Sequence, residues 1–381
     1  MMPTVGLGSG QTPRAGSPRF ARASARDDEA RYRLSMPFVT DILGPRRPVV
    51  RPTSPLVAGR RRRTSTIDTH PDGQGGSHPV KARVDLRARD AVATAADSVE
   101  VLGEIRIDAH LVDSVISDIR AIRATGSMPQ ASRLEALRGS RVGPGFRSKV
   151  GKQFPGEARR GSLLHLLLDD WVGAALVSGY GTQHTAIVLG IEQKMPPGVA
   201  DRMAGICAGF APEASLIGYA RRHDVIPTGR GPVAPKLDGL HDVEPLRPRG
   251  MRRFRRLDVW PVDANVVASV QFEAHFRDSH MDDDLVETIV HEYTVAGTVD
   301  KSTRTITSVS AEVRVLPWQE CPGAIGSAAR VAGMTLAELR DRVRAEFVGT
   351  STCTHLNDTL RAIADLDALL DLRVAAQMPG E

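Results

Sequence analysis

Three stretches in the C-terminal part of the chain place hydrophobic residues at every second position. They are residues 266–276, 288–299 and 304–316. A period of two is typical of a strand that buries one face. Aspartate- and serine-containing turns at residues 282–284 and 300–302 separate the stretches, which favours an antiparallel meander.

The alternation also predicts which side chains share a face of this meander. Val270, Phe272, Ala274 and Phe276 fall on one face of the first stretch, and Ile289, His291, Tyr293 and Val295 fall on one face of the second. The pattern therefore places one histidine on a mostly apolar face, where it is either a core residue or a ligand.

After Pro317 the period changes to that of helices. Residues 322–332 are small and rich in alanine, and Thr335 with Glu338 forms a capping-box pattern for a helix that runs through Phe347. A last helix follows the CTHL stretch, residues 353–356. Strands followed by helices predict an α+β unit with the helices on one face of a sheet.

Five segments of the first half recur in the second half in the same order, at offsets of 188 to 193 residues. The pairs are 62–68 with 252–258, 84–91 with 272–279, 101–109 with 289–297, 146–156 with 339–349, and 162–170 with 352–360. This order predicts a tandem duplication of a unit with four strands and three helices. The two copies are expected to pack together as a pseudo-dimer within one chain.

The domain boundaries follow from this repeat. We expect a disordered basic arm at residues 1–60, a degenerate first copy at 61–175, an insert with a Pro/Gly-rich surface linker at 176–250, and a second copy at 251–375. The arm is rich in Pro, Gly, Ser and Arg and ends in GRRRRTS, so it cannot bury enough apolar surface to offset its ordering entropy.

Charge and composition narrow the classes of protein. The net charge is +5, but residues 1–63 hold 13 arginines and 4 acidic residues, so the remaining chain is net negative. An isolated arginine cluster is a weak indicator of nucleic-acid binding. No apolar run is long enough for a membrane span, and the start lacks the apolar core of a secretory signal. Three widely spaced cysteines indicate a reducing compartment, so we expect a cytoplasmic protein.

The candidate chemistry lies at the start of the last helix. Cys353 stands two residues before His355, and the two side chains converge only if Cys353 sits at or before the N-cap. Unpaired amides at a helix start favour a thiolate there. Cys321, His291 or a carboxylate such as Glu292 or Asp278 could complete a set of metal ligands.

The first copy lacks most of this set. His165 stands opposite His355, but Leu163 takes the place of Cys353 and Gly103 the place of His291. The repeat therefore predicts chemistry in the second copy only.

The second copy resembles the bacterial family called domain of unknown function 2889, through FEAHFRDSH, VHEYTV, VLPWQECPGA, LRDRVRAEF and CTHLNDTL, over residues 251 to about 372. That resemblance implies no established activity. The order of strands, Cys321 and the final helix start is also similar to the NifU/IscU-type scaffold proteins of iron–sulfur assembly, which implies a SufE/NifU-like fold and cluster-binding thiols. The chain departs from that pattern because it has Cys-x-His in place of His-Cys and lacks a cysteine between the early strands.

Three hypotheses remain open. The first is a metal-binding protein, with zinc or an iron–sulfur cluster held by Cys321, Cys353, His355 and His291. The second is a thiol enzyme in which Cys353 is the nucleophile and His355 the base. The third is a non-catalytic accessory protein in which these side chains are structural.

Overall fold

A computed structural model describes residues 49–72, 80–95, 98–125, 131–191, 195–237, 239–263 and 266–372, which all lie in the compact unit Pro37–Glu381. Most of the expected basic arm, residues 1–48, lies outside the described residues.

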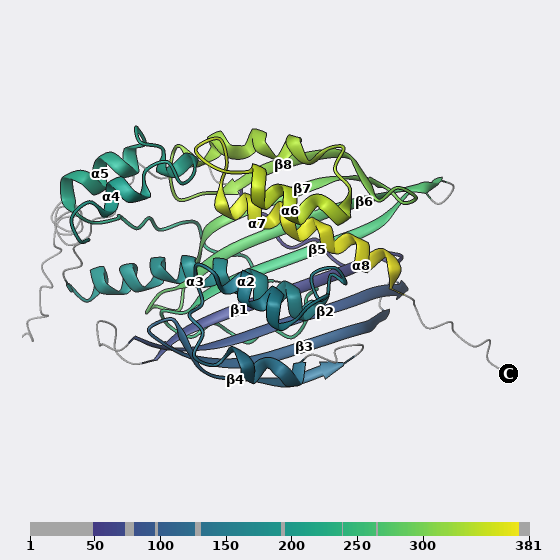
Figure 1. The fold of residues 1–381 in the computed structure, drawn as a ribbon, viewed down its shortest axis with the longest axis horizontal. Helices are drawn as coiled ribbons and strands as arrows, with labels where there is room; N and C mark the ends of the chain where they lie inside the picture. Colours follow the sequence, from purple (N-terminus) through teal and green to yellow (C-terminus); the bar gives the residue numbers. More distant parts are fainter. Residues whose placement is uncertain are drawn as a thin grey trace, which may run out of the picture. The chain divides into compact units, whose positions relative to one another are not determined.

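One antiparallel sheet of eight strands organises this unit (Figure 1). The strands are β1 Arg61–Asp72, β2 Lys81–Ala95, β3 Ser98–Val112, β4 Val115–Thr125, β5 Met251–Asp263, β6 Val266–Met281, β7 Glu287–Asp300 and β8 Thr305–Val315. Their order in the sheet is β4-β3-β2-β1-β5-β6-β7-β8. The expected α+β fold with antiparallel meanders is confirmed.

Helices follow each set of four strands. The first set precedes the 3-10 helix η2 Ala131–Leu137, α2 Phe146–Gln153, α3 Leu163–Val188, α4 Val199–Met203, η3 Ala208–Phe210 and α5 Ser215–His223. The second set precedes η4 Cys321–Val331, α6 Leu336–Glu346, α7 Thr354–Ala362, η5 Ile363–Asp365 and α8 Leu366–Asp371. Thr335 caps α6 in the predicted capping box with Glu338.

Two hydrophobic cores lie between the sheet and these helices. One joins β1–β4 to η2, α2 and the first half of α3, and the other joins β5–β8 to η4, α6, α7 and α8. Val270, Phe272, Ala274 and Phe276 all point into the second core, as the period-two pattern predicted. In Figure 1 the helices α2, α3, α6, α7 and α8 lie across one face of the sheet.

The Pro/Gly-rich segment after α5 covers the opposite face of the sheet and is not a detached surface linker. His241, which is 5% exposed, lies 2.8 Å and 2.9 Å from the hydroxyl groups of Thr64 and Thr66 on β1. Arg62 and Arg252 donate to the carbonyl oxygens of Gly239 and Glu244. Polar outward-facing strand residues give this segment hydrogen-bonding partners, because its irregular backbone has carbonyl groups to satisfy.

The two halves meet where β1 pairs with β5, and this junction is reciprocal. Arg62 of β1 pairs with Asp258 of β5, and Arg252 of β5 pairs with Asp68 of β1. The five repeated segments fall on corresponding elements, namely β1 and β5, β2 and β6, β3 and β7, α2 and α6, and the starts of α3 and α7. The origin of this arrangement in a duplication stays a prediction.

Two expected boundaries differ from the structure. Residues 49–60 are not part of a detached arm, because the Val49 amide donates to the carbonyl of Arg314 on β8 and Thr53 is buried. The arginines of GRRRRTS begin β1. Arg62 and Arg63 are buried there, and each is paired with a carboxylate that is distant in sequence, so the local sequence does not reveal it. The expected end of the first copy at residue 175 falls inside α3.

Candidate metal centre

A buried network of arginine and aspartate side chains connects the two halves beneath the helices. We call it the polar belt, and its members are Arg147, Asp169, Asp170, Arg253, Arg255, Asp278, Asp358 and Arg361. The belt contains four cations and four anions, so its formal charge is balanced. Buried charges of this kind persist only when they are paired and hydrogen-bonded.

Arg253 lies at the centre of the polar belt. It makes a two-pronged contact with Asp278, at 2.9 Å and 3.0 Å, and its Nη1 lies 3.2 Å from Asp170 and 3.1 Å from Asp358. The side chains of Arg253 and Asp278 are fully buried. Because Arg is planar with five donors, it can hold three carboxylates at once.

Gly173 on α3 lets the helix approach this group. A Cβ at this position would fall 2.7 Å from Cζ of Arg253 and 2.6 Å from Oδ2 of Asp358. Glycine is required here for close packing and not for backbone conformation.

Two histidines face the same oxygen of Asp278. His291 is the cross-strand partner of Asp278, and its Nδ1 lies 3.2 Å from Oδ2. His355, the second residue of α7, places its Nε2 at 3.8 Å from the same oxygen. The three ligand atoms lie within 4.8 Å of one another. The structure therefore brings together His291, His355 and Asp278, three of the candidates expected from the sequence.

The two imidazole rings stack, with centroids 3.7 Å apart and an interplanar angle of 21°. Both Nδ1 of His291 and Nε2 of His355 are buried, and neither makes a well-aligned hydrogen bond among the described residues, although Nδ1 of His291 lies within 3.2 Å of Oδ2 of Asp278. Buried polar atoms of this kind are rare in proteins and call for an explanation such as an ion.

The ionisation of the site follows from burial and neighbouring charge. Burial alone raises the pKa of Asp278, but the charge of Arg253 and the neighbouring His291 outweigh it and leave the pKa well below its ordinary value. Burial and the adjacent His291 lower the pKa of His355 well below its ordinary value. At neutral pH the site therefore holds a carboxylate and a neutral His355, the forms that bind metal ions.

Cys353 lies beside this group but on the other side of His355. It is the N-cap of α7, as the sequence required, and its Sγ lies 4.0 Å from Nδ1 of His355. The hydroxyl of Tyr293 donates to this sulfur at 3.4 Å. Because Nε2 of His355 faces Asp278 while Nδ1 faces the sulfur, one ion cannot bind Asp278, Nε2 and the thiol together.

The expectation of a thiolate at Cys353 is wrong. Burial raises the pKa of Cys353, and the hydrogen bond from Tyr293 and the amides at the start of α7 do not compensate for it. Cys321, the first residue of η4, is also buried, and burial followed by the proximity of Cys353 and Cys207 raises its pKa well above the ordinary value. These cysteines are neutral thiols of the second core.

The other carboxylate considered from the sequence lies elsewhere. Glu292 points to the opposite face of the sheet, where it contacts His275 at 2.6 Å and Arg277 at 2.8 Å. The alternation of side chains along β7 separates Glu292 from His291.

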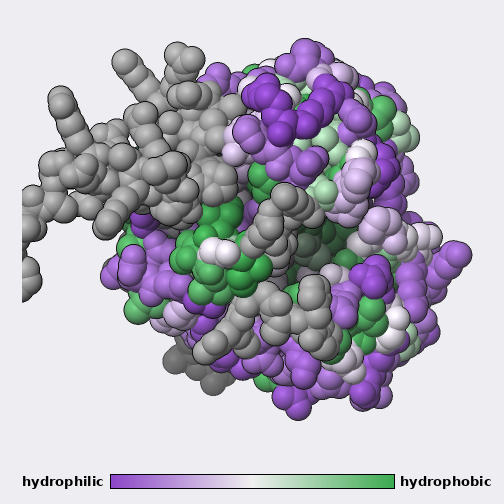
Figure 2. Space-filling model, turned by 90° about the vertical axis from the view of Figure 1, so that its left-hand side faces the viewer, coloured by the Kyte–Doolittle hydropathy of each residue, from purple (hydrophilic) through white to green (hydrophobic). Residues whose placement is uncertain are grey.

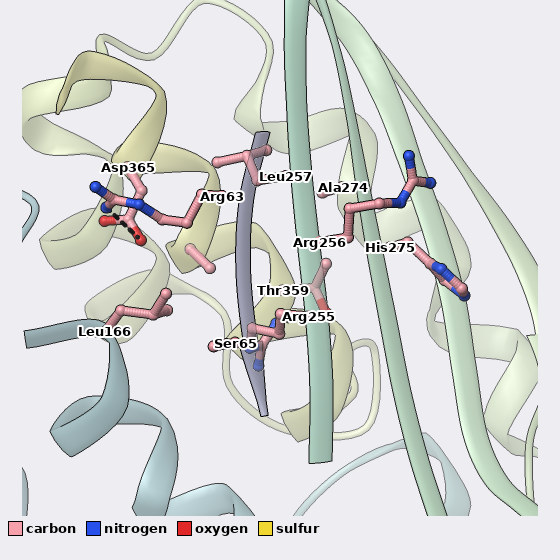
Figure 3. A pocket seen from close by; sticks show the side chains of 11 residues that line it. Arg63, Ser65, Leu166, Arg255, Arg256, Leu257, Ala274, His275, Thr359 and Asp365 are labelled. Atoms are coloured by element: carbon pink, nitrogen blue, oxygen red, sulfur yellow. Dashed lines mark hydrogen bonds and ion pairs between the residues drawn. The ribbon is translucent and has the colours of Figure 1, made fainter. Parts of the chain in front are cut away.

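A small cavity of about 20 Å³ lies next to the polar belt and suits a single water molecule (Figure 3). In that view Arg63 points to Asp365, while Arg256 and His275 point away on the other side of the sheet. Cys353, His291 and His355 do not line it.

The first half contains part of the same arrangement. Arg63 makes a two-pronged contact with Asp90, at 2.7 Å for each bond, as Arg253 does with Asp278. His165 lies in the first turn of α3, three residues after its N-cap, as His355 lies in the first turn of α7, two residues after its N-cap, and His165 is buried. Gly103 and Leu163 replace the second imidazole and the thiol, and Leu163 Cδ1 lies 3.8 Å from the Cβ position of Gly103. No group of three ligands forms there among the described residues.

A match to a family model covers the second half of the chain. Residues 251–368 match a family described as "Protein of unknown function (DUF2889)", which agrees with the resemblance expected for this part. A comparison with curated proteins found no match. One solved structure, "Crystal structure of lipopolysaccharide binding protein", aligns with 72% of this chain and 92% of its own chain at 7% identity, and its TM-score of 0.11 carries no structural conclusion. The similarity to NifU/IscU-type scaffolds finds no support among these matches.

Across the described part of the chain, no helix combines the length and apolar character needed to cross a membrane.

Proposed function

We propose that the second half of the chain is a metal-binding module, in which Oδ2 of Asp278, Nδ1 of His291 and Nε2 of His355 hold one divalent ion such as zinc. The observation that carries this proposal is the convergence of two buried ring nitrogens on one carboxylate oxygen, with all three ligand atoms within 4.8 Å of one another. Two imidazoles and a carboxylate form a recurrent ligand set for zinc and iron.

The distances support an ion of this size. With metal–ligand bonds of roughly 2.0–2.2 Å, two ligands of a tetrahedral ion lie roughly 3–3.5 Å apart. The separation of 3.2 Å between His291 and Asp278 lies in that range, and the 3.8 Å between His355 and Asp278 lies a little above it. The stacked rings are nearly parallel, so one ring must tilt by rotation about χ2 for both lone pairs to meet at the ion.

Arg253 acts as the support of this site. It holds Asp278 in place through two hydrogen bonds and leaves a lone pair of Oδ2 for the ion. The burial of the three ligand atoms favours a structural ion over one that turns over a substrate. This function deepens the metal-binding hypothesis and replaces its thiol ligands with Asp278.

The test is metal content measured on the full chain after exposure to zinc and removal of free ion. We expect one zinc per chain, lost in His291→Gln and in His355→Gln. The matched controls are His165→Gln, at the corresponding place in the first half, and His275→Gln, a buried histidine on the opposite face of the sheet. Both controls should keep the ion.

The cobalt(II) form separates this site from a thiol site. A bound cobalt ion without a thiolate-to-metal charge-transfer absorption, and full retention of zinc in Cys353→Ser, support the proposal. Absence of stoichiometric metal, or its loss in Cys353→Ser and not in His291→Gln, contradicts it.

A thiol enzyme is the second candidate, because the imidazole of His355 lies between the thiol of Cys353 and the carboxylate of Asp278. Efficient alkylation of Cys353 at neutral pH in the folded, metal-free chain would favour it. The raised pKa and the burial of Cys353 predict instead that the thiol resists labelling until the chain unfolds. Resistance in a chain that binds no metal would leave the accessory hypothesis.

A further inference from the structure

A second candidate site lies in the first half, near the C-terminal end of α3. A cavity of about 560 Å³ opens there between α3 and the ends of the central strands. Its size lies within the range of small-molecule pockets in proteins. Figure 2 shows the side of the molecule on which α3 ends, where a hollow with hydrophobic residues at its floor is visible.

One face of α3 forms a wall of this cavity. The lining positions on that face recur at helical spacing and are Trp171, Ala175, Ser178, Thr182 and Thr185. N-terminal to Trp171, the long side chains of Leu164, Leu167 and Leu168 fill the space between α3 and the sheet. After Trp171 the side chains become short, so the space between helix and sheet stays open.

The glycines of α3 support this interpretation. Gly173 is required by Arg253, and at Gly181 a Cβ would lie 2.9 Å from Cγ of Met251. Gly179 lines the cavity and is itself exposed, and no atom lies within 4 Å of its Cβ position. Glycine disfavours a helix interior, and packing supplies no reason for it at residue 179.

The charged lining residues Asp72, Lys81 and Asp113 are exposed, so the buried polar groups of the lining indicate the chemistry of an occupant. The Trp171 side chain is fully buried and lines the cavity, yet its Nε1–H has no hydrogen-bond acceptor among the described residues. Nε2 of Gln183, on the same lining, is also buried without a partner among them. Both atoms are hydrogen-bond donors, so the group that satisfies them must be an acceptor.

The floor of the cavity is apolar. Leu111 of β3, Ala82 of β2 and Met251 of β5 line it together with the indole ring of Trp171. A ligand that buries an alkyl or ring system against these side chains gains binding free energy from the buried apolar surface. Its acceptor would at the same time take a hydrogen bond from the indole N–H.

We propose that this cavity binds a small amphipathic molecule with an apolar body and one terminal hydrogen-bond acceptor, a carboxylate or a carbonyl. The site is independent of the metal centre, because it shares no residue with it. The juxtaposition of an apolar floor with two unsatisfied donors carries the proposal.

The experiment is calorimetric titration of the full chain with decanoate, 2-decanone and decylamine. Decanoate and 2-decanone offer acceptors of different charge, whereas the decylammonium head only donates. We expect binding of decanoate, 2-decanone or both, and at least tenfold weaker binding of decylamine. Tighter binding of decanoate would assign a carboxylate ligand, and equal binding would assign any acceptor.

Gly179→Leu is the diagnostic variant, because it adds a side chain where the structure has space and improves helix propensity. It should fold as well as the natural chain and bind the preferred ligand at least tenfold more weakly. The matched control is Leu176→Phe, which adds bulk at a solvent-exposed position of the same helix outside the cavity and should leave affinity unchanged. Absence of binding by both acceptors, equal binding of decylamine, or unchanged affinity in a folded Gly179→Leu chain overturns the proposal.

Discussion

Gly173→Ala offers a direct test of the polar belt, because one methyl group would meet the guanidinium of Arg253 and the carboxylate of Asp358. The Cβ position lies 2.7 Å from Cζ of Arg253, far inside van der Waals contact. Arg253 cannot move aside at low cost, since three carboxylates hold it and its side chain is fully buried. Either α3 shifts outward or the guanidinium leaves at least one partner.

The magnitude follows from two opposing effects. Replacing glycine by alanine in a helix interior stabilises it by about 1 kcal/mol, whereas breaking a buried ion pair costs about 3–5 kcal/mol, so a net loss of about 2–4 kcal/mol is expected. The matched control is Gly179→Ala on the same helix, where nothing lies within 4 Å of the new methyl group. The control should gain up to about 1 kcal/mol.

The assay is urea unfolding followed by circular dichroism for the natural chain and both variants. Gly173→Ala should lower the unfolding midpoint and Gly179→Ala should raise it or leave it unchanged. Equal or greater stability of Gly173→Ala would refute the close approach of α3 to Arg253. It would also remove the support that we assign to Asp278.

Three further predictions concern pH, the segment over the second sheet face and a helix cap. Burial, followed by the charge of Arg340, lowers the pKa of His165 to about 4, so this side chain is neutral in the folded chain and stability falls as pH drops from about 6.5 to about 4. The free energy of unfolding should fall by on the order of 3 kcal/mol over that window because of this group alone. Urea unfolding of His165→Gln should therefore show a flatter pH profile there. His241→Ala removes both hydrogen bonds to β1, and hydrogen exchange should then accelerate in residues 239–246 with little change in β7; unchanged exchange would show that the segment is held by other contacts. Thr335→Ala removes the N-cap of α6 and should cost about 1 kcal/mol, measured by urea unfolding, whereas Thr307→Ala on the exposed part of β8 should cost less.

Regular alternation made the second half the more predictable part of the fold. The strands from Val266 to Val315 and the cap at Thr335 have local patterns, and the structure places them within a few residues of the expected bounds. The pairing of β1 with β5 has no local pattern. It depends on reciprocal contacts such as Arg62 with Asp258, across 196 residues of chain.

The burial of arginine side chains is the feature of the fold that the sequence predicts least well. A run such as Arg60–Arg63 is usually solvated, and the burial of Arg62 and Arg63 in this fold depends on the carboxylates of Asp258 and Asp90 on distant elements. The same reason hides the polar belt. Alternation did identify the face of His291, and Asp278 was among the candidate carboxylates, but only the register of β6 with β7 distinguishes Asp278 from Glu292.

The thiols illustrate a second limit. Position at a helix start favours a thiolate, and Cys353 does occupy the N-cap of α7. The cost of burying a charge outweighs that local effect, and burial depends on the whole second core. A local pattern therefore located Cys353 and failed to predict its ionisation.

The central claim is that one ion sits between Asp278, His291 and His355. The most direct measurement is an anomalous difference map from crystals of the zinc-loaded chain, recorded on both sides of the zinc absorption edge. We predict one peak within about 2.0–2.2 Å of Oδ2 of Asp278, Nδ1 of His291 and Nε2 of His355. A zinc-loaded crystal with no peak there, or with its peak on the sulfur atoms of Cys321 and Cys353, would contradict the account.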